Sequence, residues 1–158
     1  MVFLILLFCI AITIHNIEEA IWLPAWSQQP TRFQKPVSKG EFRFAVTVIT
    51  LLAYAAASSY LLWPHAELVK WIFTGFLGSM IINAVFPHLV ATLVMKQYAP
   101  GMITGLLLNI LVNSFILSRM HAEDIISTWE LVLSTVIVGG FILSLIPLLF
   151  KVGRKLKS

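Results

Sequence analysis

The residues best suited to chemistry lie in "HNIEE", residues 15 to 19, inside an apolar stretch that begins at the first residue. On a helix, Glu18 and Glu19 follow His15 by three and four positions, so all three side chains point into one sector about 100° wide. A charge at the centre of a bilayer costs from about 2.5 to more than 10 kcal/mol, depending on how it is measured. Three ionisable groups in such a stretch therefore indicate a site in the protein interior, where they pair with one another or bind a cation.

Other polar residues lie at a similar level in later apolar segments. Asn83 and His88 come late in the third segment, in "SMIINAVFPH", and Thr104 comes early in the fourth, in "PGMIT". The first and third segments run in the same direction, so their late positions lie at one level, and the fourth runs back, so its early positions lie at that level too. We expect these side chains near HNIEE. The candidate catalytic and metal-ligating residues are His15, Glu18, Glu19 and His88, and the candidate substrate-binding residues are Asn83, Tyr54, Thr104, Asn109 and Asn113.

Each candidate also has a purely structural interpretation. The two glutamates could mark a helix end, although the apolar residues 20–23 follow them. His88 could hydrogen-bond a backbone carbonyl freed by Pro87. The two asparagines of the fourth segment, four residues apart, could join helices by packing. Tyr54 belongs to a polar stripe on the second segment that we expect to point inward, for function or for close packing: Thr47, Thr50, Tyr54 and Ser58.

The composition indicates that lipid surrounds the elements that position these residues. The chain has 158 residues, of which 59% are hydrophobic and 11% charged, and its mean hydropathy is +0.91. Ordinary soluble chains carry roughly 25% charged residues. Five apolar segments approach the ~20 residues that cross a bilayer. We predict an all-α bundle in one integral membrane domain, 1–158, with transmembrane helices near residues 2–23, 44–63, 68–95, 101–118 and 125–150.

Lysine and arginine are distributed unevenly over the connections. Five crossings place nine of them on one side, including Arg32 and Lys157, and only Lys70 and Arg119 on the other. By the positive-inside rule the N-terminus is outside and the C-terminus cytoplasmic. This distribution explains the net charge of +4 without nucleic acid, which we do not expect as a partner. The single cysteine, Cys9, excludes an intrachain disulfide and a thiolate-rich metal site.

The motif His15-x-x-Glu18-Glu19 resembles the defining motif of the HXXEE-domain family, small multi-span bacterial membrane proteins. The likeness extends along nearly the whole chain, through Asn83 with His88 and then Pro100-Gly101. The resemblance implies that the motif lies in the first membrane helix, that the protein is integral to the bacterial cytoplasmic membrane, and that the motif forms a shared site. It does not imply a reaction.

The chemistry of these residue types allows two kinds of site. One or two histidines with carboxylates suit a divalent metal such as Zn²⁺, Fe²⁺ or Mn²⁺, and the two-histidine–one-carboxylate set is the relevant pattern. The spacing differs from the HExxH of zinc proteases, so that chemistry is not predicted. Without a metal, neighbouring acids in a low dielectric provide one protonated and one ionised carboxyl group for acid–base catalysis.

The function favoured by the sequence is an intramembrane enzyme that isomerises or cyclises a lipidic, isoprenoid-like or other apolar small molecule. The alternatives are a proton- or cation-coupled transporter and a structural membrane protein whose polar cluster only joins helices. An enzyme should have a cavity that opens to lipid, whereas a transporter should have polar groups that continue to both faces. The expected partners are membrane lipid and the substrate, and the sequence leaves the oligomeric state open.

Overall fold

The computed structural model describes residues 1–29 and 35–156, and its regular elements are all helices. Five helical stretches within these residues are long and apolar enough to cross a membrane: Val2–Trp26, Lys39–Leu62, Glu67–Met95, Met102–Ala122 and Thr128–Lys155. The predicted all-α fold with five apolar helices is therefore confirmed, and it is compatible with a multi-pass membrane protein. Arg32 and Lys157, which entered the charge distribution, lie outside the described residues.

The first, second and last stretches are single helices: α1 (Val2–Trp26), α2 (Lys39–Leu62) and α7 (Thr128–Lys155). The third is divided into α3 (Glu67–Asn83), η1 (Ala84–Leu89) and α4 (Val90–Met95). The fourth is divided into α5 (Met102–Thr104), η2 (Gly105–Ile110) and α6 (Leu111–Ala122). The two divided stretches are the ones that carry most of the candidate polar residues.

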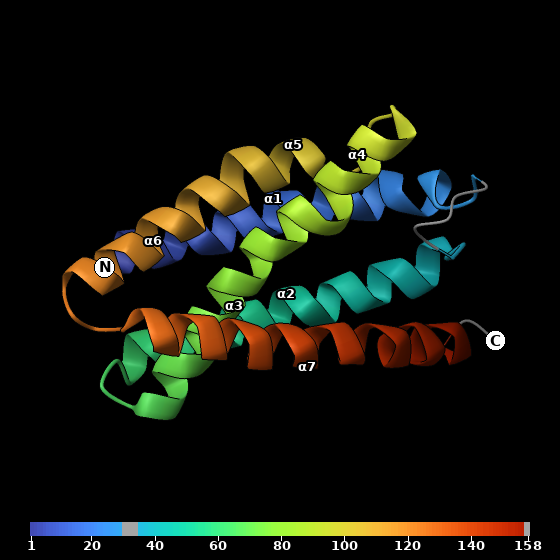
Figure 1. Ribbon diagram of the computed structural model, residues 1–158. Helices are drawn as coiled ribbons and strands as arrows, with labels where there is room; N and C mark the ends of the chain where they lie inside the picture. The colour runs from blue at the N-terminus through green and yellow to red at the C-terminus, as the bar shows by residue number, and fades with distance from the viewer. Residues whose placement is uncertain (30–34, 157–158) are drawn as a thin grey trace.

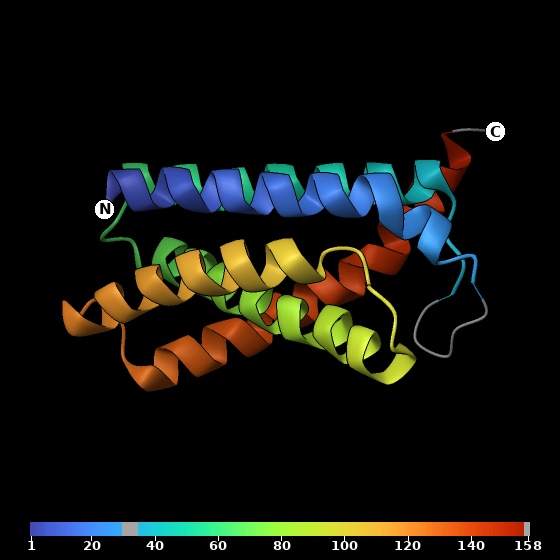
Figure 2. The ribbon, with the colours of Figure 1, turned by 90° about the horizontal axis from the view of Figure 1, so that it is seen from above.

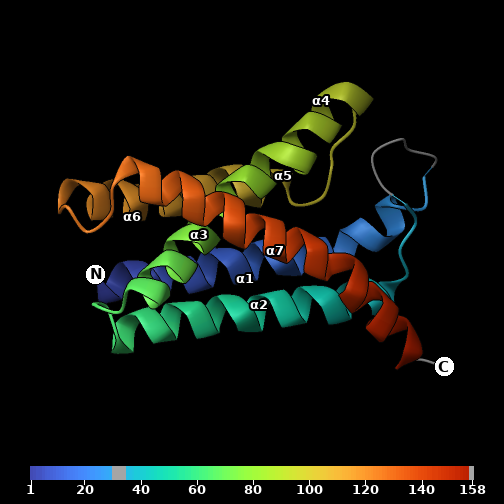
Figure 3. The ribbon, with the colours of Figure 1, turned by 60° about the horizontal axis from the view of Figure 1, so that its bottom comes forward.

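The two ends of the chain lie at opposite ends of the bundle (Figure 1). The N-terminus shares its end with the α2–α3 and α6–α7 connections, and the C-terminus shares the other end with the α4–α5 connection (Figures 1 and 2). The helices α1 and α2 run antiparallel, side by side (Figure 3). This is the up-and-down arrangement that short connections favour.

Serine caps begin α2 and α7. The backbone N–H of Glu41 donates to Ser38 Oγ at 3.3 Å, and the N–H of Ser38 donates to the Glu41 carboxylate at 2.9 Å. Ser127 and Glu130 form the same reciprocal pair at the start of α7. Each cap satisfies two backbone donors that a helix start leaves free. Arg154, near the end of α7, also donates to Glu41 at 2.5 Å and so ties the end of α7 to the start of α2.

Aromatic side chains fill the half of the bundle that holds the N-terminus. The ring of Phe8 meets Phe73 and Phe76 edge-on, with centroids 5.6 and 6.2 Å apart, and Tyr60 stacks on Phe73 at 4.8 Å. These rings come from α1, α2 and α3, and Phe8 and Phe73 are fully buried. HNIEE lies two turns further along α1, so the polar site occupies the other half of the bundle.

Small residues hold α3 close to α7. A Cβ atom at Gly75 would meet the Ser134 carbonyl oxygen, and one at Gly78 would meet the Thr135 side chain. Such small residues allow helices in a membrane to approach closely and pack by van der Waals contact. The close packing fixes the position of α3, whose last residue, Asn83, reaches the site.

The backbone becomes irregular at the level of HNIEE. The turns of η2 are as wide as those of a π-helix, whereas η1 is a kink between two helices, with extended angles at Phe86, φ −128° and ψ 118°. The Phe86–Pro87 peptide bond is cis. A left-handed residue, Gly101 at φ +90°, precedes α5. Single π-helical turns often occur at functional sites, and irregular backbone at membrane depth is tolerated where the protein buries it.

Candidate metal centre

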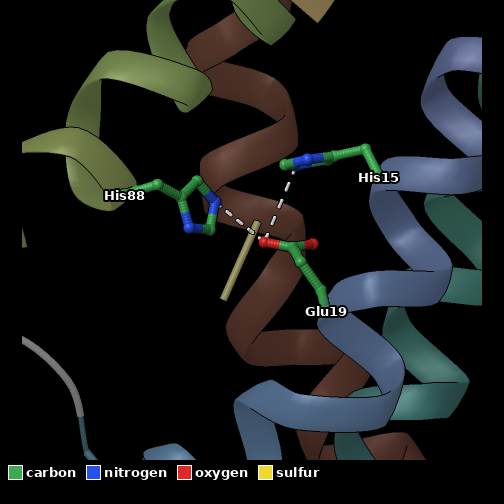
Figure 4. A group of neighbouring side chains, drawn as sticks. All are labelled: His15, Glu19 and His88. Atoms are coloured by element: carbon green, nitrogen blue, oxygen red, sulfur yellow. Dashed lines mark ion pairs between the residues drawn. The ribbon is translucent and has the colours of Figure 1, made fainter. Parts of the chain in front are cut away.

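His15, Glu19 and His88 meet between α1 and η1 (Figure 4), and we call these three residues the candidate centre. His15 and Glu19 lie one turn apart on α1. Glu19 Oε1 lies 2.8 Å from His88 Nε2 and 3.8 Å from His15 Nε2. All three residues are buried: His15 is 0% exposed, Glu19 9% and His88 3%. The structure thus brings His88 to the HNIEE helix, as their shared level in the sequence predicts.

The donor atoms of the candidate centre are close enough to share one cation. One ring nitrogen of each histidine and one carboxylate oxygen all lie within 4.8 Å of one another. Two imidazoles and a carboxylate form catalytic zinc sites and the facial triad of non-haem iron. A carboxylate buried in an apolar bundle also needs a positive partner, either a protonated histidine or a cation. The residues present therefore fit a divalent metal.

The ring of His15 is oriented by a chain of two hydrogen bonds. Its Nδ1 lies 3.0 Å from Thr104 Oγ1, and the Thr104 hydroxyl donates to Glu18 Oε2 at 2.6 Å. Because the hydroxyl proton is used for Glu18, Thr104 accepts the proton of His15 Nδ1. The Nε2 atom then carries a lone pair on the side of Glu19. Metal-bound histidines are typically held in this way, with the second ring N–H donated to an outer acceptor.

Glu18 lies outside the candidate centre, although we expected it among the metal ligands. Its Oε1 accepts from the backbone N–H of Gly101 at 2.9 Å and from the Tyr98 hydroxyl, and its Oε2 accepts from Thr104. Partial desolvation and the bond to Glu18 raise the pKa of Tyr98 to about 12, so the phenol keeps the proton that it donates. Glu18 therefore anchors His15 and the 96–101 connection and does not face the cation position.

Gly101 closes the candidate centre from the side of the connection. A Cβ atom at this residue would lie 2.9 Å from His88 Cε1 and 3.0 Å from His15 Cε1. Gly105, one turn later, packs against Ala84. Glycine is required at residue 101 both by its positive φ and by the close approach of the two rings.

The remaining candidates are divided between the centre and the rest of the bundle. Asn83 Nδ2 lies 3.3 Å from Nε2 of both histidines. Asn109 and Asn113 are fully buried, but Asn113 donates to the Leu77 carbonyl at 3.4 Å and Asn109 has no hydrogen-bond partner within the described residues. Within the described residues, neither of them hydrogen-bonds to the candidate centre.

The expectation that Tyr54 points inward is wrong. Tyr54 is 37% exposed, lines a groove between α2 and α1 and hydrogen-bonds to Thr13. The other members of the polar stripe are exposed or half-buried as well. The buried face of α2 instead carries apolar and mostly small residues, Ala45, Ile49, Ala53, Ala56, Ala57 and Tyr60. Small side chains allow the neighbouring helices to pack closely, so this face turns inward.

Two residues at the site were not among the candidates. Tyr98 holds Glu18, and Gly105 lets η2 approach η1. The sequence carries a signal for Gly105, because "GMITG" places glycines at residues 101 and 105. This spacing is typical of helices that approach closely. Tyr98 carries no comparable signal, because an aromatic residue near a helix end is ordinary in a membrane protein.

We expect Thr104→Val to weaken metal binding, because valine has the shape of threonine but cannot accept the His15 Nδ1 proton. Loss of an outer hydrogen-bond partner typically lowers metal affinity by ~10–100-fold. Thr104→Ser keeps the hydroxyl and should bind as the natural protein does. A Zn²⁺ titration against a chelating dye measures both variants in detergent. Equal affinities for the valine and serine variants would contradict this role of Thr104.

Comparisons with known proteins agree with the motif. A family model described as "Protein of unknown function with HXXEE motif" matches residues 6–116, a range that contains the whole candidate centre. A Bacillus subtilis (strain 168) protein named "Uncharacterized protein YrkK" is 61% identical over 155 residues, which is 98% of each chain. No solved structure matches. The chain therefore belongs to the family of proteins with the HXXEE motif.

Proposed function

We propose that this protein is an intramembrane enzyme that acts on a lipidic, isoprenoid-like or other apolar small molecule at the candidate centre. Its cofactor in this proposal is a divalent metal such as Zn²⁺, Fe²⁺ or Mn²⁺. The observation that carries the proposal is a set of two imidazole nitrogens and one carboxylate oxygen within 4.8 Å, buried among helices long enough to cross a membrane. A three-ligand set leaves a coordination position for water or substrate.

The crevice beside His88 is apolar but narrow, about 10 Å³, which is room for one water molecule. Its lining consists of Leu23, Trp26, Pro87, His88, Ala91, Ala99 and Pro100, and His88 is the only ionisable residue among them. Trp26 Nε1 is buried and has no hydrogen-bond partner within the described residues. A substrate must therefore widen this crevice to reach the imidazole, and the apolar lining favours an apolar molecule.

Without a metal, Glu19 and His88 are suited to moving a proton on such a substrate. Their facing atoms are 2.8 Å apart, within the range for direct proton transfer. A bound metal would supply Lewis-acid polarisation of a substrate oxygen. Isomerisation and cyclisation of apolar molecules both require a proton to be placed or removed at a defined carbon. Acid–base catalysis by the same two residues without a metal is the variant of this proposal that metal analysis tests.

The distribution of basic residues supports a membrane orientation for the enzyme. Lys39, Lys96 and Lys151 lie at the end of the bundle that holds the C-terminus, whereas Lys70 and Arg119 lie at the opposite end. The positive-inside rule then places the C-terminus in the cytoplasm and the N-terminus outside, in the bacterial cytoplasmic membrane. In this orientation the candidate centre lies in the cytoplasmic half of the bilayer.

A proton- or cation-coupled transporter is the second candidate. It is favoured by buried polar atoms that continue from the candidate centre toward the other end of the bundle. The atoms are Nδ2 and Oδ1 of Asn109, Oδ1 of Asn113 and Oγ1 of Thr74, which are buried and have no hydrogen-bond partner within the described residues. Transport paths through membrane proteins are lined by polar groups of this kind.

The enzyme proposal is tested by the lipids of cells that produce the protein. We expect the natural sequence to generate an altered apolar lipid, seen by mass spectrometry, that disappears with Glu19→Gln because its carboxylate is lost. Glu123→Gln is the matched control, since Glu123 is exposed and pairs with Arg119 away from the centre. Identical lipids with and without Glu19 would contradict an enzyme, and Glu19-dependent uptake of Zn²⁺ or Mn²⁺ into vesicles would show a transporter.

A further inference from the structure

The Asn83 amide lies between the two histidines of the candidate centre. Its Nδ2 atom is 3.3 Å from His15 Nε2 and 3.3 Å from His88 Nε2. Asn83 is the last residue of α3, directly before the irregular turns of η1, and it is half-buried. The amide therefore faces the same two nitrogen atoms that a metal would use.

The two distances from the Asn83 amide to the imidazoles fit the spacing of a four-coordinate metal. A tetrahedral zinc site with ligands at 2.0–2.1 Å has ligand–ligand distances of about 3.3–3.4 Å. The amide nitrogen is 3.3 Å from both imidazole nitrogens, and Glu19 Oε1 is 2.8 and 3.8 Å from the same two atoms. Glu19 Oε1 must shift to lie equally far from both nitrogens, and the donor atoms of His15, Glu19 and His88, which lie within 4.8 Å of one another, must close around the ion.

An amide presents either of two atoms at the same place. A half-turn about the Cβ–Cγ bond of Asn83 exchanges Nδ2 for Oδ1, because the two ends of the amide have nearly the same shape. With Nδ2 inward, the amide donates to the lone pair of His15 Nε2, while His88 Nε2 donates its own proton to Glu19. With Oδ1 inward, the amide offers a neutral oxygen to a cation bound by the two imidazoles.

We propose that Asn83 Oδ1 is the fourth protein ligand of a divalent metal held by His15, Glu19 and His88. This inference rests on the proposed metal centre and deepens it. The resulting set has two nitrogens, two oxygens and one negative charge, which suits the borderline ions Zn²⁺, Fe²⁺ and Mn²⁺. A neutral amide oxygen is also the weakest ligand of the four, so it is the one that a substrate oxygen displaces. The amide thereby links cation binding to substrate entry.

Two substitutions separate a ligand from a hydrogen-bond donor. Asn83→Asp keeps an oxygen ligand and adds a charge, but it has no N–H to donate to the imidazoles. Asn83→Leu keeps the approximate volume and removes both functions. A ligand role predicts that the aspartate variant binds Zn²⁺ at least as tightly as the natural protein. It also predicts that the leucine variant binds ~10–100-fold more weakly, the range seen when partners of a metal site are lost.

The experiment is a Zn²⁺ titration of the full chain in detergent, with Co²⁺ absorption spectra of the same samples. Asn16→Leu is the matched control, because Asn16 is also buried but donates to Thr50 at 2.7 Å. We expect the control and the aspartate variant to keep the intense visible bands of four-coordinate Co²⁺, and the leucine variant to lose intensity. Circular dichroism checks that each variant is folded.

Each outcome decides a different question. If the leucine variant binds Zn²⁺ and Co²⁺ as the natural protein does, the fourth-ligand role is overturned and the three-residue metal centre stands. Weaker binding by a folded aspartate variant also overturns it and assigns Asn83 a donor role. A natural protein that binds neither ion overturns the metal centre itself. If the leucine variant does not fold, the Zn²⁺ affinity of Asn83→Asp relative to the natural protein decides whether Asn83 is a ligand.

Discussion

Glu19→Gln is expected to abolish metal binding, the largest effect of any single substitution in this protein. The carboxylate is the only negative charge among the donor atoms of the candidate centre, and its Oε1 lies 2.8 Å from His88 Nε2. Glutamine keeps the shape but offers a neutral oxygen or an N–H to the cation. The loss should exceed the ~10–100-fold that outer partners cost. Elemental analysis of protein purified in detergent measures the ratio of metal to chain.

The neighbouring residue provides the matched control for this prediction. Glu18→Gln removes the same charge one position earlier, but Glu18 touches Thr104, Tyr98 and Gly101 and not the cation position. We expect this variant to retain metal with reduced affinity. Equal metal contents for the Glu18 and Glu19 variants would show that the structure assigns the two glutamates incorrectly.

Gly101→Ala is the second substitution with a large expected effect, on stability as well as on the centre. The residue has φ +90°, and an added Cβ would lie 2.9, 3.0 and 3.1 Å from His88 Cε1, His15 Cε1 and Glu19 Cγ. A left-handed backbone costs an alanine about 1–2 kcal/mol, and overpacking typically adds about 1–3 kcal/mol. We expect a lower thermal midpoint in detergent and loss of bound metal, because both imidazoles must move.

Gly140→Ala separates this local effect from a general effect of adding a methyl group. Nothing lies within 4 Å of a Cβ at Gly140, which is part of α7. Alanine is favoured over glycine inside a helix by roughly 0.5–1 kcal/mol, so the control should be as stable as the natural protein or slightly more so. If Gly101→Ala and Gly140→Ala have the same thermal midpoint and the same Zn²⁺ affinity, the 96–101 connection does not close the candidate centre.

The general fold follows directly from composition and the lengths of the apolar segments. Five apolar stretches with short polar connections leave few arrangements other than a bundle, because a membrane requires every backbone hydrogen bond to be made within a helix. The approach of His88 to HNIEE also follows, because the first and third stretches run in the same direction and carry these residues late, at one level. These predictions depend only on helix geometry and chain direction.

Which neighbour each side chain meets could not be predicted in the same way. Glu18 and Glu19 differ by one position, or about 100° around α1. That rotation turns Glu19 toward His88 and Glu18 toward the start of α5. Which neighbour each glutamate faces depends on which helices flank α1, and no local sequence pattern specifies the order of the helices around it. The prediction that Tyr54 points inward was wrong for a related reason, because the sequence allows either the alanine face or the threonine face of α2 to pack inward.

X-ray absorption at the edge of the bound metal tests the central claim most directly. The sample is the natural protein, purified in detergent without chelator. The account predicts about one metal ion per chain, with nitrogen and oxygen ligands near 2.0–2.1 Å for Zn²⁺ and the outer scattering of two imidazole rings. A protein free of metal after loading, or a metal without imidazole in its ligand set, would contradict the account.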